Sequence, residues 1–104
     1  MIMTTGEKIP GKEVSQILGI SQGSTVRARN ITYDIFAGLK NLIGGEIKEY
    51  TKLQSDSRDQ ALQRMEENAL NLGADAIINV RISTSMIMQG SSEILSYGTA
   101  VKLK

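Results

Sequence analysis

The longest regular apolar pattern in the chain runs from Glu46 to Leu72, a stretch without Gly or Pro. At about 100° per residue, its apolar side chains share one stripe roughly 100° wide: Ile47, Tyr50, Ala61, Met65, Ala69 and Leu72. Polar residues interrupt the middle of the stripe: Gln54, Ser57 and Arg58. The apolar phase is the same on both sides, which predicts one continuous helix, ended by Gly73 because glycine accepts a positive φ. A break near residues 55–57, where Ser or Asp caps a fresh start, is the alternative.

A second, shorter helix is predicted from Asn30, which suits an N-cap, to residue 43. The apolar positions that follow Asn30 are spaced i, i+1, i+4, i+7 and i+8, which is one face of a helix of about three turns: Ile35, Phe36, Leu39, Leu42 and Ile43. The Gly44-Gly45 pair ends this helix before the long one begins.

Alternating positions from Glu13 onward predict a strand that is apolar on both faces and is bent or bulged at Gly19. Residues 21–24 predict a turn, after which residues 25–28 resume as a strand. Upstream, the Pro10-Gly11 pair predicts a further turn, and residues 1–6 are β-prone.

Two more strands are predicted after Gly73. The first has one strongly apolar face: Ile78, Val80, Ile82, Thr84, Met86 and Met88. Residues 90–92 predict a hairpin loop. In the last strand the expected inward positions are Leu95, Tyr97, Thr99, Val101 and Leu103, and the outward ones Ser96, Gly98, Lys102 and Lys104. The order strand, helices, strand, strand predicts an α+β subunit, β-α-β-β, in which an antiparallel sheet packs on one long and one short helix.

The long helix also bears on assembly. About 27 helical residues span roughly 40 Å, whereas a compact domain of this length has a radius of gyration near ~13 Å and a diameter of roughly 33 Å. The helix is therefore expected to overhang its own domain, and its first apolar side chains, Ile47, Tyr50 and Leu53, to need a neighbouring subunit. A head-to-tail homo-oligomer that closes into a ring supplies one, and Tyr50→Asp is expected to weaken it.

Composition narrows the function classes. The 104 residues predict one domain, 1–104, and the net charge of +1 gives no broad attraction to nucleic acid or to a membrane surface. Aromatic residues are too few for a base-stacking surface. The chain has no Cys and no His, hence no thiolate chemistry and neither the commonest general base nor the commonest metal ligand. No signal peptide or apolar span is recognisable, so a cytoplasmic protein is expected.

Two groups of residues have a functional and a structural interpretation. Met86 and Met88 are two apart on a predicted strand, so they would share a face, where two thioethers could bind Cu(I); filling of a core or interface is the preferred interpretation. Arg58 could bind an anion at a subunit boundary, but packing of its stem, with its head paired to a carboxylate, is preferred.

Two further groups are also interpreted as structural. Gly44-Gly45 precedes a helix start that could hold a phosphate, but no phosphate-binding motif accompanies it and the nearby Glu46 would repel an anion. Glu66 and Glu67 are adjacent on the solvated side of the long helix, which does not suit a catalytic carboxylate pair. No catalytic, cofactor-binding or metal-ligating residue is therefore assigned.

Three blocks of sequence resemble the YbjQ-like family, small prokaryotic proteins often labelled "putative heavy-metal-binding domain": NITYDIFAGLKNLIGGEIKEYTKL, RDQALQRMEENALNLGADAIINVRI and SYGTAVKL. The resemblance extends from Gly6 to Leu103. It implies a dodecin-like β-α-β-β subunit assembled into a ring, most simply a pentamer, and it implies no established activity. No family metal ligand can be assigned to a position here, because the matching residue types are missing.

The expected function is a non-enzymatic homo-oligomeric ring, of five subunits, that binds or stores a small molecule or ion at its subunit interfaces. A structural or adaptor ring that binds a protein partner is the alternative. The expected partner is the chain itself, with no cofactor, no nucleic acid and no membrane.

Overall fold

The computed structural model describes residues 1–28, 48–88 and 90–104, together with the side chains of all of these except 27–28 and 48–53. The predicted short helix with Gly44-Gly45, and the side chains of Ile47, Tyr50 and Leu53, lie outside this description. The described elements are β1 (Ile2–Met3), β2 (Val14–Ala28), α2 (Lys48–Asn71), β3 (Ala76–Met88) and β4 (Ser91–Leu103).

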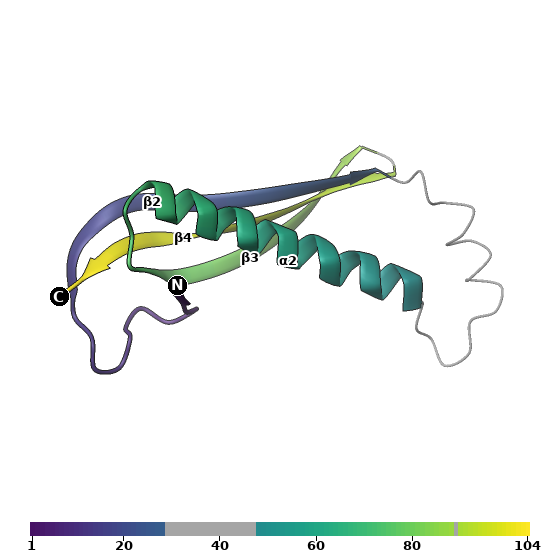
Figure 1. The fold of residues 1–104 in the computed structure, drawn as a ribbon. Coiled ribbons are helices and arrows are strands. Elements are labelled where there is room, and N and C mark those ends of the chain that lie inside the picture. The colour runs from purple at the N-terminus through teal and green to yellow at the C-terminus, as the bar shows by residue number, and fades with distance from the viewer. Residues whose placement is uncertain (29–47, 89) are drawn as a thin grey trace.

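The strands form one sheet in the order β1-β3-β4-β2, with α2 packed on one of its faces (Figure 1). The three long strands are antiparallel, as predicted, but β1 pairs with β3 in parallel, so the sheet is mixed. The prediction of a wholly antiparallel sheet is wrong at β1 because no hairpin joins β1 to its partner, and so nothing fixes an antiparallel direction. The α+β class is confirmed.

Helix α2 is continuous through residues 55–57, so the alternative of a break there is wrong. It ends as predicted at Gly73, which has a φ of +83°. The Gly73 amide donates to the Leu70 carbonyl and the Ala74 amide to the Ala69 carbonyl, both at 3.0 Å. This pair of bonds is the Schellman arrangement, and it satisfies two carbonyls that the helix leaves unpaired.

The subunit is elongated, with extents of 54 × 27 × 16 Å and a radius of gyration of 17.1 Å. The prediction of a compact body about 33 Å across is therefore wrong, because the sheet follows long strands rather than a sphere. A helix of 24 residues spans about 36 Å. It runs along the strands and diverges from the sheet toward its N-terminus (Figure 1).

Strand β2 runs unbroken through the turn predicted at 21–24, so that prediction is wrong. Its small residues serve close packing instead: a Cβ on Gly23 would collide with the backbone of Ala61 and Met65 in α2. The bulge expected at Gly19 is confirmed, with a φ of +132° and a shift of register between Ile17 and Gly19.

A second bulge reverses the expected phase of β3. Asn79 has a φ of +53°, and the register with β4 shifts between Ile78 and Arg81. Ile77 and Val80 consequently share the helix side of the sheet with Met65, whereas Ile78 packs with the opposite cluster. The prediction that Ile78 and Val80 share a face is therefore wrong, because strict alternation has no provision for an inserted residue.

The predicted faces of β4 are also reversed. Ser96 and Ala100 are fully buried on the helix side, whereas Tyr97, expected inside, is 40% exposed on the other face. The helix backbone approaches β4 so closely that only small side chains fit between them. The prediction placed the apolar residues of β4 inside on polarity alone, and so it chose the wrong face. Val101 is buried as predicted, but in the second cluster, with Ala76, Ile78 and the N-terminal Ile9.

Candidate functional site

Two buried hydroxyls fix α2 against the sheet. Ser21 Oγ donates to the Met65 carbonyl at 2.6 Å and Ser96 Oγ to the Ala61 carbonyl at 2.7 Å. Both acceptors are carbonyls that already belong to the helix, so each hydroxyl is satisfied without a space-filling side chain between the layers. The helix is thus held close to β2 and β4 (Figure 1). On β3 it packs with Ile77 and Val80, and it leaves the far face of the sheet uncovered.

Side chains of α2 also cap part of the outer edge of β2. Asn68 Oδ1 accepts from the Gln22 amide at 3.2 Å, and Arg64 Nη1 donates to the Ser24 carbonyl at 2.6 Å. Bonds of this kind satisfy backbone groups that an edge strand would otherwise expose. Among the described residues, this capping reaches the Gln22 amide and the Ser24 carbonyl.

The N-terminal segment protects the outer edge of β3 in the same way. The Thr4 amide donates to the Ile77 carbonyl, the Val80 amide to the Thr4 carbonyl and the Asn79 amide to the Gly6 carbonyl, each at 3.0 Å. Arg81 Nη1 then donates to the Thr5 carbonyl at 2.8 Å. Beyond Arg81, no described segment continues along this edge.

The sheet face opposite α2 carries an apolar surface, here called the open face: Ile17, Ile20, Val26 and Tyr97, which are 67%, 73%, 55% and 40% exposed. Their strand partners place them on one side, since Ile17, Ile20 and Val26 oppose Val101, Thr99 and Glu93, alternate residues of β4 in step with Tyr97. They are spread along β2, with Gln22 and Ser24 between them on the same face. Large apolar side chains exposed along one face of a sheet are typical of a contact surface. Sequence reasoning missed it because the alternation in β2 did not reveal which face α2 would cover.

The end of the β3–β4 hairpin is the second uncovered region. All residues from Arg81 to Met88 are exposed, including Met86 at 78% and Met88 at 64%. Met86 pairs with Ser92 and Met88 with Ser91, which are consecutive residues and hence lie on opposite faces of β4. The prediction that the two thioethers share a face is therefore wrong, because a bulge separates them.

The remaining candidates lie apart from one another. Arg58, which the helical stripe placed near the core, is exposed, and Ser57 is buried in its place. Glu66 accepts a charged hydrogen bond from the N-terminal amine of Met1 at 3.3 Å, while Glu67 is exposed. The structure thus brings none of these side chains together in one site.

The donor atoms on this chain do not fit a heavy-metal centre. There is no His or Cys anywhere in the sequence, and in the part of the chain that the structure describes no three carboxylates gather. The exposed methionines Met86 and Met88 face opposite ways, and soft metals require thiolate, thioether or imidazole donors arranged around one point.

We expect no tight zinc site, because the chain lacks the imidazole and thiolate groups that zinc sites use. Protein dialysed against micromolar zinc and then washed is expected to retain well under one zinc per chain by elemental analysis. A relative that carries His or Cys, treated identically, is the control. Stoichiometric zinc with submicromolar affinity would contradict the expectation.

No described helix is long and apolar enough to cross a membrane. A shallow, open depression is lined by Thr5, Val80, Arg81 and Ile82, where the N-terminal segment leaves β3. Its lining is mostly apolar. Arg81 Nη1 already donates hydrogen bonds to the Thr5 and Val80 carbonyls. The depression therefore suggests no catalytic or binding role.

Comparison with known proteins confirms the resemblance. A family model described as "Putative heavy-metal-binding" matches residues 1–104. The UPF0145 proteins of Archaeoglobus fulgidus and Halorubrum lacusprofundi are 54% and 56% identical over 104 residues, which covers all of this chain and 96% and 100% of theirs. A crystal structure of a protein of unknown function from Pediococcus pentosaceus, of the DUF74 family, shares the fold with a TM-score of 0.66 at 18% identity, over 100% of this chain and 98% of that one. The chain belongs to the YbjQ-like, UPF0145 family.

Proposed function

We propose that the chain is the subunit of a non-enzymatic homo-oligomeric ring that binds or stores a small molecule or ion between subunits. The observation that carries the proposal is the open face, whose four apolar side chains include Ile20 at 73% exposure. Burial of apolar surface contributes about 25 cal/mol per Å². A complex in which a partner covers the open face is therefore more stable than the isolated subunit, whose open face is in water. Five subunits is the number that the family resemblance implies.

The shape of the subunit supports assembly. An elongated body of 54 × 27 × 16 Å exposes more surface for its mass than a sphere does, and α2 covers only one face of the sheet. Side-by-side packing of such subunits covers the open faces and reduces the surface area that each subunit exposes to solvent. A heterologous contact of this kind closes into a ring if its rotation allows.

The interfaces are the proposed location of a ligand, because the residues that the structure describes bring no catalytic group of side chains together. The chain has no His and no Cys, and the hydroxyls of Ser21 and Ser96, which are buried under α2, donate to helix carbonyls. An apolar cavity between open faces would suit a small apolar or amphipathic molecule.

Light scattering at micromolar concentration is expected to give the mass of five chains. Ile20→Lys is expected to weaken the assembly at least about tenfold, because a buried ammonium in an apolar contact costs more than ~1.4 kcal/mol. The subunit itself should stay folded, since the Ile20 side chain is 73% exposed. Gln63→Lys, at an exposed position of α2, is the matched control. A folded wild-type monomer at these concentrations would refute the ring.

Native mass spectrometry of protein purified from its own cell separates the two kinds of ring. A constant mass excess over five chains, lost on denaturation, supports ligand storage. Ligand-free rings that carry a stoichiometric second polypeptide instead support the adaptor function.

A further inference from the structure

The five methionines of the chain are its only sulfur-containing residues, because the sequence has no cysteine. Their exposure differs widely: Met65 is fully buried, Met1 and Met3 are each 38% exposed, and Met86 and Met88 are 78% and 64% exposed. Methionine is usually among the buried residue types. Two strongly exposed methionines close together in β3 are therefore a feature that core packing does not explain.

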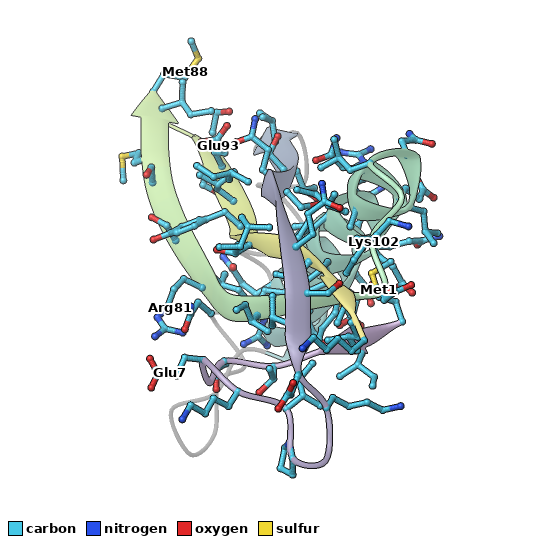
Figure 2. The ribbon with its side chains drawn as sticks, turned by 90° about the vertical axis from the view of Figure 1, so that its left-hand side faces the viewer. Met1, Glu7, Arg81, Met88, Glu93 and Lys102 are labelled. Carbon is cyan, nitrogen blue, oxygen red and sulfur yellow. The ribbon has the colours of Figure 1, made fainter. Side chains whose placement is uncertain are left out.

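These two methionines lie at the end of the β3–β4 hairpin, where they form, with Ser91 and Ser92, the thioether tip. Met88 is the last residue of β3, and Figure 2 shows its side chain directed away from the rest of the molecule. The register shift between Met86 and Met88 turns the two side chains to opposite faces of the hairpin. A dissolved oxidant therefore reaches a thioether on either face of the tip without any opening of the fold.

Each thioether of the tip has a serine directly across the hairpin. Met86 is opposite Ser92, and Met88 is opposite Ser91. Directly opposed side chains on antiparallel strands start from Cβ atoms about 4.5–5.5 Å apart, which is close enough for contact. A thioether sulfur is a weak hydrogen-bond acceptor, whereas the oxygen of a sulfoxide is a strong one. A serine hydroxyl in this position therefore favours the oxidised side chain over the reduced one.

We propose that the thioether tip is a site of reversible oxidation by hydrogen peroxide. A sulfur lone pair of Met86 or Met88 attacks one peroxide oxygen, so that an S–O bond forms and the O–O bond breaks. The attacked oxygen passes its proton to the departing hydroxide, which leaves as water, and the thioether has lost two electrons to become a sulfoxide. In the return step a dithiol, acting through methionine sulfoxide reductases, removes the oxygen as water and becomes a disulfide.

Oxidation of the tip changes the surface and spares the fold. A sulfoxide is polar where the thioether was apolar, so both faces of the tip lose apolar character together. Neither Met86 nor Met88 belongs to the two core clusters of the described residues, whereas Met65 lies within one of them. The tip thus reacts with oxidant in the folded state before the core methionine does. The inference requires only an accessible tip and does not rest on the proposed ring.

A time course of oxidation tests the order in which the methionines react. The full chain, at the concentration used for light scattering, is treated with millimolar hydrogen peroxide, and the sulfoxide at each methionine is quantified by peptide mass spectrometry. Met86 and Met88 are expected to react at least about tenfold faster than Met65, because a buried side chain reacts only after the structure opens. Rates at the tip no faster than that of Met65 would overturn the proposal.

Leucine variants connect the change of surface to these two side chains, because leucine resembles methionine in volume and cannot be oxidised. Brief peroxide treatment, ended once Met86 and Met88 have reacted, is expected to shorten the retention of the wild type on a hydrophobic-interaction column. The double variant Met86→Leu, Met88→Leu is expected to keep its retention, while the matched control Met65→Leu behaves as the wild type does. Reductases for both sulfoxide epimers, supplied with a dithiol, are expected to restore the wild-type retention. A shift in the double variant, or no restoration in folded protein, would contradict the proposal.

Alanine variants of the tip serines show whether the site is built to stabilise the sulfoxides. Ser91→Ala and Ser92→Ala, made separately, are expected to lower the Tm of the oxidised protein by a few degrees more than that of the reduced protein, since each removes a hydrogen bond that only the sulfoxide forms strongly. Ser83→Ala, at another exposed position of β3, is the matched control and is expected to affect both forms equally. Equal effects of the tip variants on both forms would overturn the assignment of these serines to the oxidised state.

Discussion

Gly23→Ala is expected to separate α2 from the sheet and to destabilise the protein by at least about 3 kcal/mol, at the upper end of overpacking costs. A Cβ at this position would overlap the amide nitrogen of Met65 and the carbonyl oxygen of Ala61, and it would lie 2.8 Å from the carbonyl carbon of Arg64. All three atoms are backbone, so no side chain can rotate away. The helix itself would have to move, which would also break the bonds from Ser21 and Ser96.

Thermal unfolding at fixed protein concentration measures the loss, which corresponds to a fall in Tm of roughly 15 °C for a domain of this size. Gly6→Ala is the matched control, because its Cβ would meet nothing closer than Thr4 Oγ1 at 3.6 Å. The control is expected to unfold within a few degrees of wild type. A Gly23→Ala protein as stable as Gly6→Ala would show that α2 does not approach β2 as closely as described.

Met65→Asp is expected to leave the chain unfolded at 25 °C. Met65 is fully buried at the centre of the main core cluster, among Ala69, Ile77, Val80 and Ala100. The substitution removes a large apolar side chain, at about 2–5 kcal/mol, and places a carboxylate in an apolar cluster, at several more. The sum is of the order of the whole stability of a domain this small, roughly 5–15 kcal/mol.

Circular dichroism and the elution volume in gel filtration report the outcome. Gln63→Asp, an exposed position two residues away on the same helix, controls for the helix propensity of Asp and is expected to fold normally. A soluble Met65→Asp protein with a wild-type melting curve would mean that the apolar stripe of α2 had been assigned to the wrong face.

The elements with strong local signals were predictable from sequence. Helix α2 keeps one apolar phase through Ala61, Met65 and Ala69, and its end at Gly73 follows from a backbone requirement that glycine meets. The Pro10-Gly11 turn is likewise local: Lys12 donates to the Ile9 carbonyl at 3.1 Å, and Gly11 has a φ of +76°.

The features that failed depend on tertiary contacts. Which face of β4 is buried is decided by the closeness of α2, so serine and alanine lie inside and Tyr97 outside. The inserted residue at Asn79 leaves no mark in an alternating pattern, although asparagine tolerates a positive φ better than most residues. The open face could not be found either, since it is defined by the absence of a covering helix rather than by any motif.

The site hypotheses failed or stayed open for a related reason. Met86 and Met88 were paired by spacing alone, and one bulge between them cancels that spacing. The expectations of an oligomer and of a non-enzymatic role rest on surface and composition, and they remain predictions until the assembly is measured.

The position of β4 in the sheet has a consequence for folding. This strand lies between β2 and β3, yet it is the last described element along the chain. Strand β2 leaves the ribosome early and has no partner until α2 and β3 have been synthesised and β4 has followed them. The sheet therefore closes late through contacts distant in sequence, which slows folding and exposes the apolar residues of β2 to aggregation in the meantime. Chaperone dependence and low yield at high expression temperature are expected to originate in this delay.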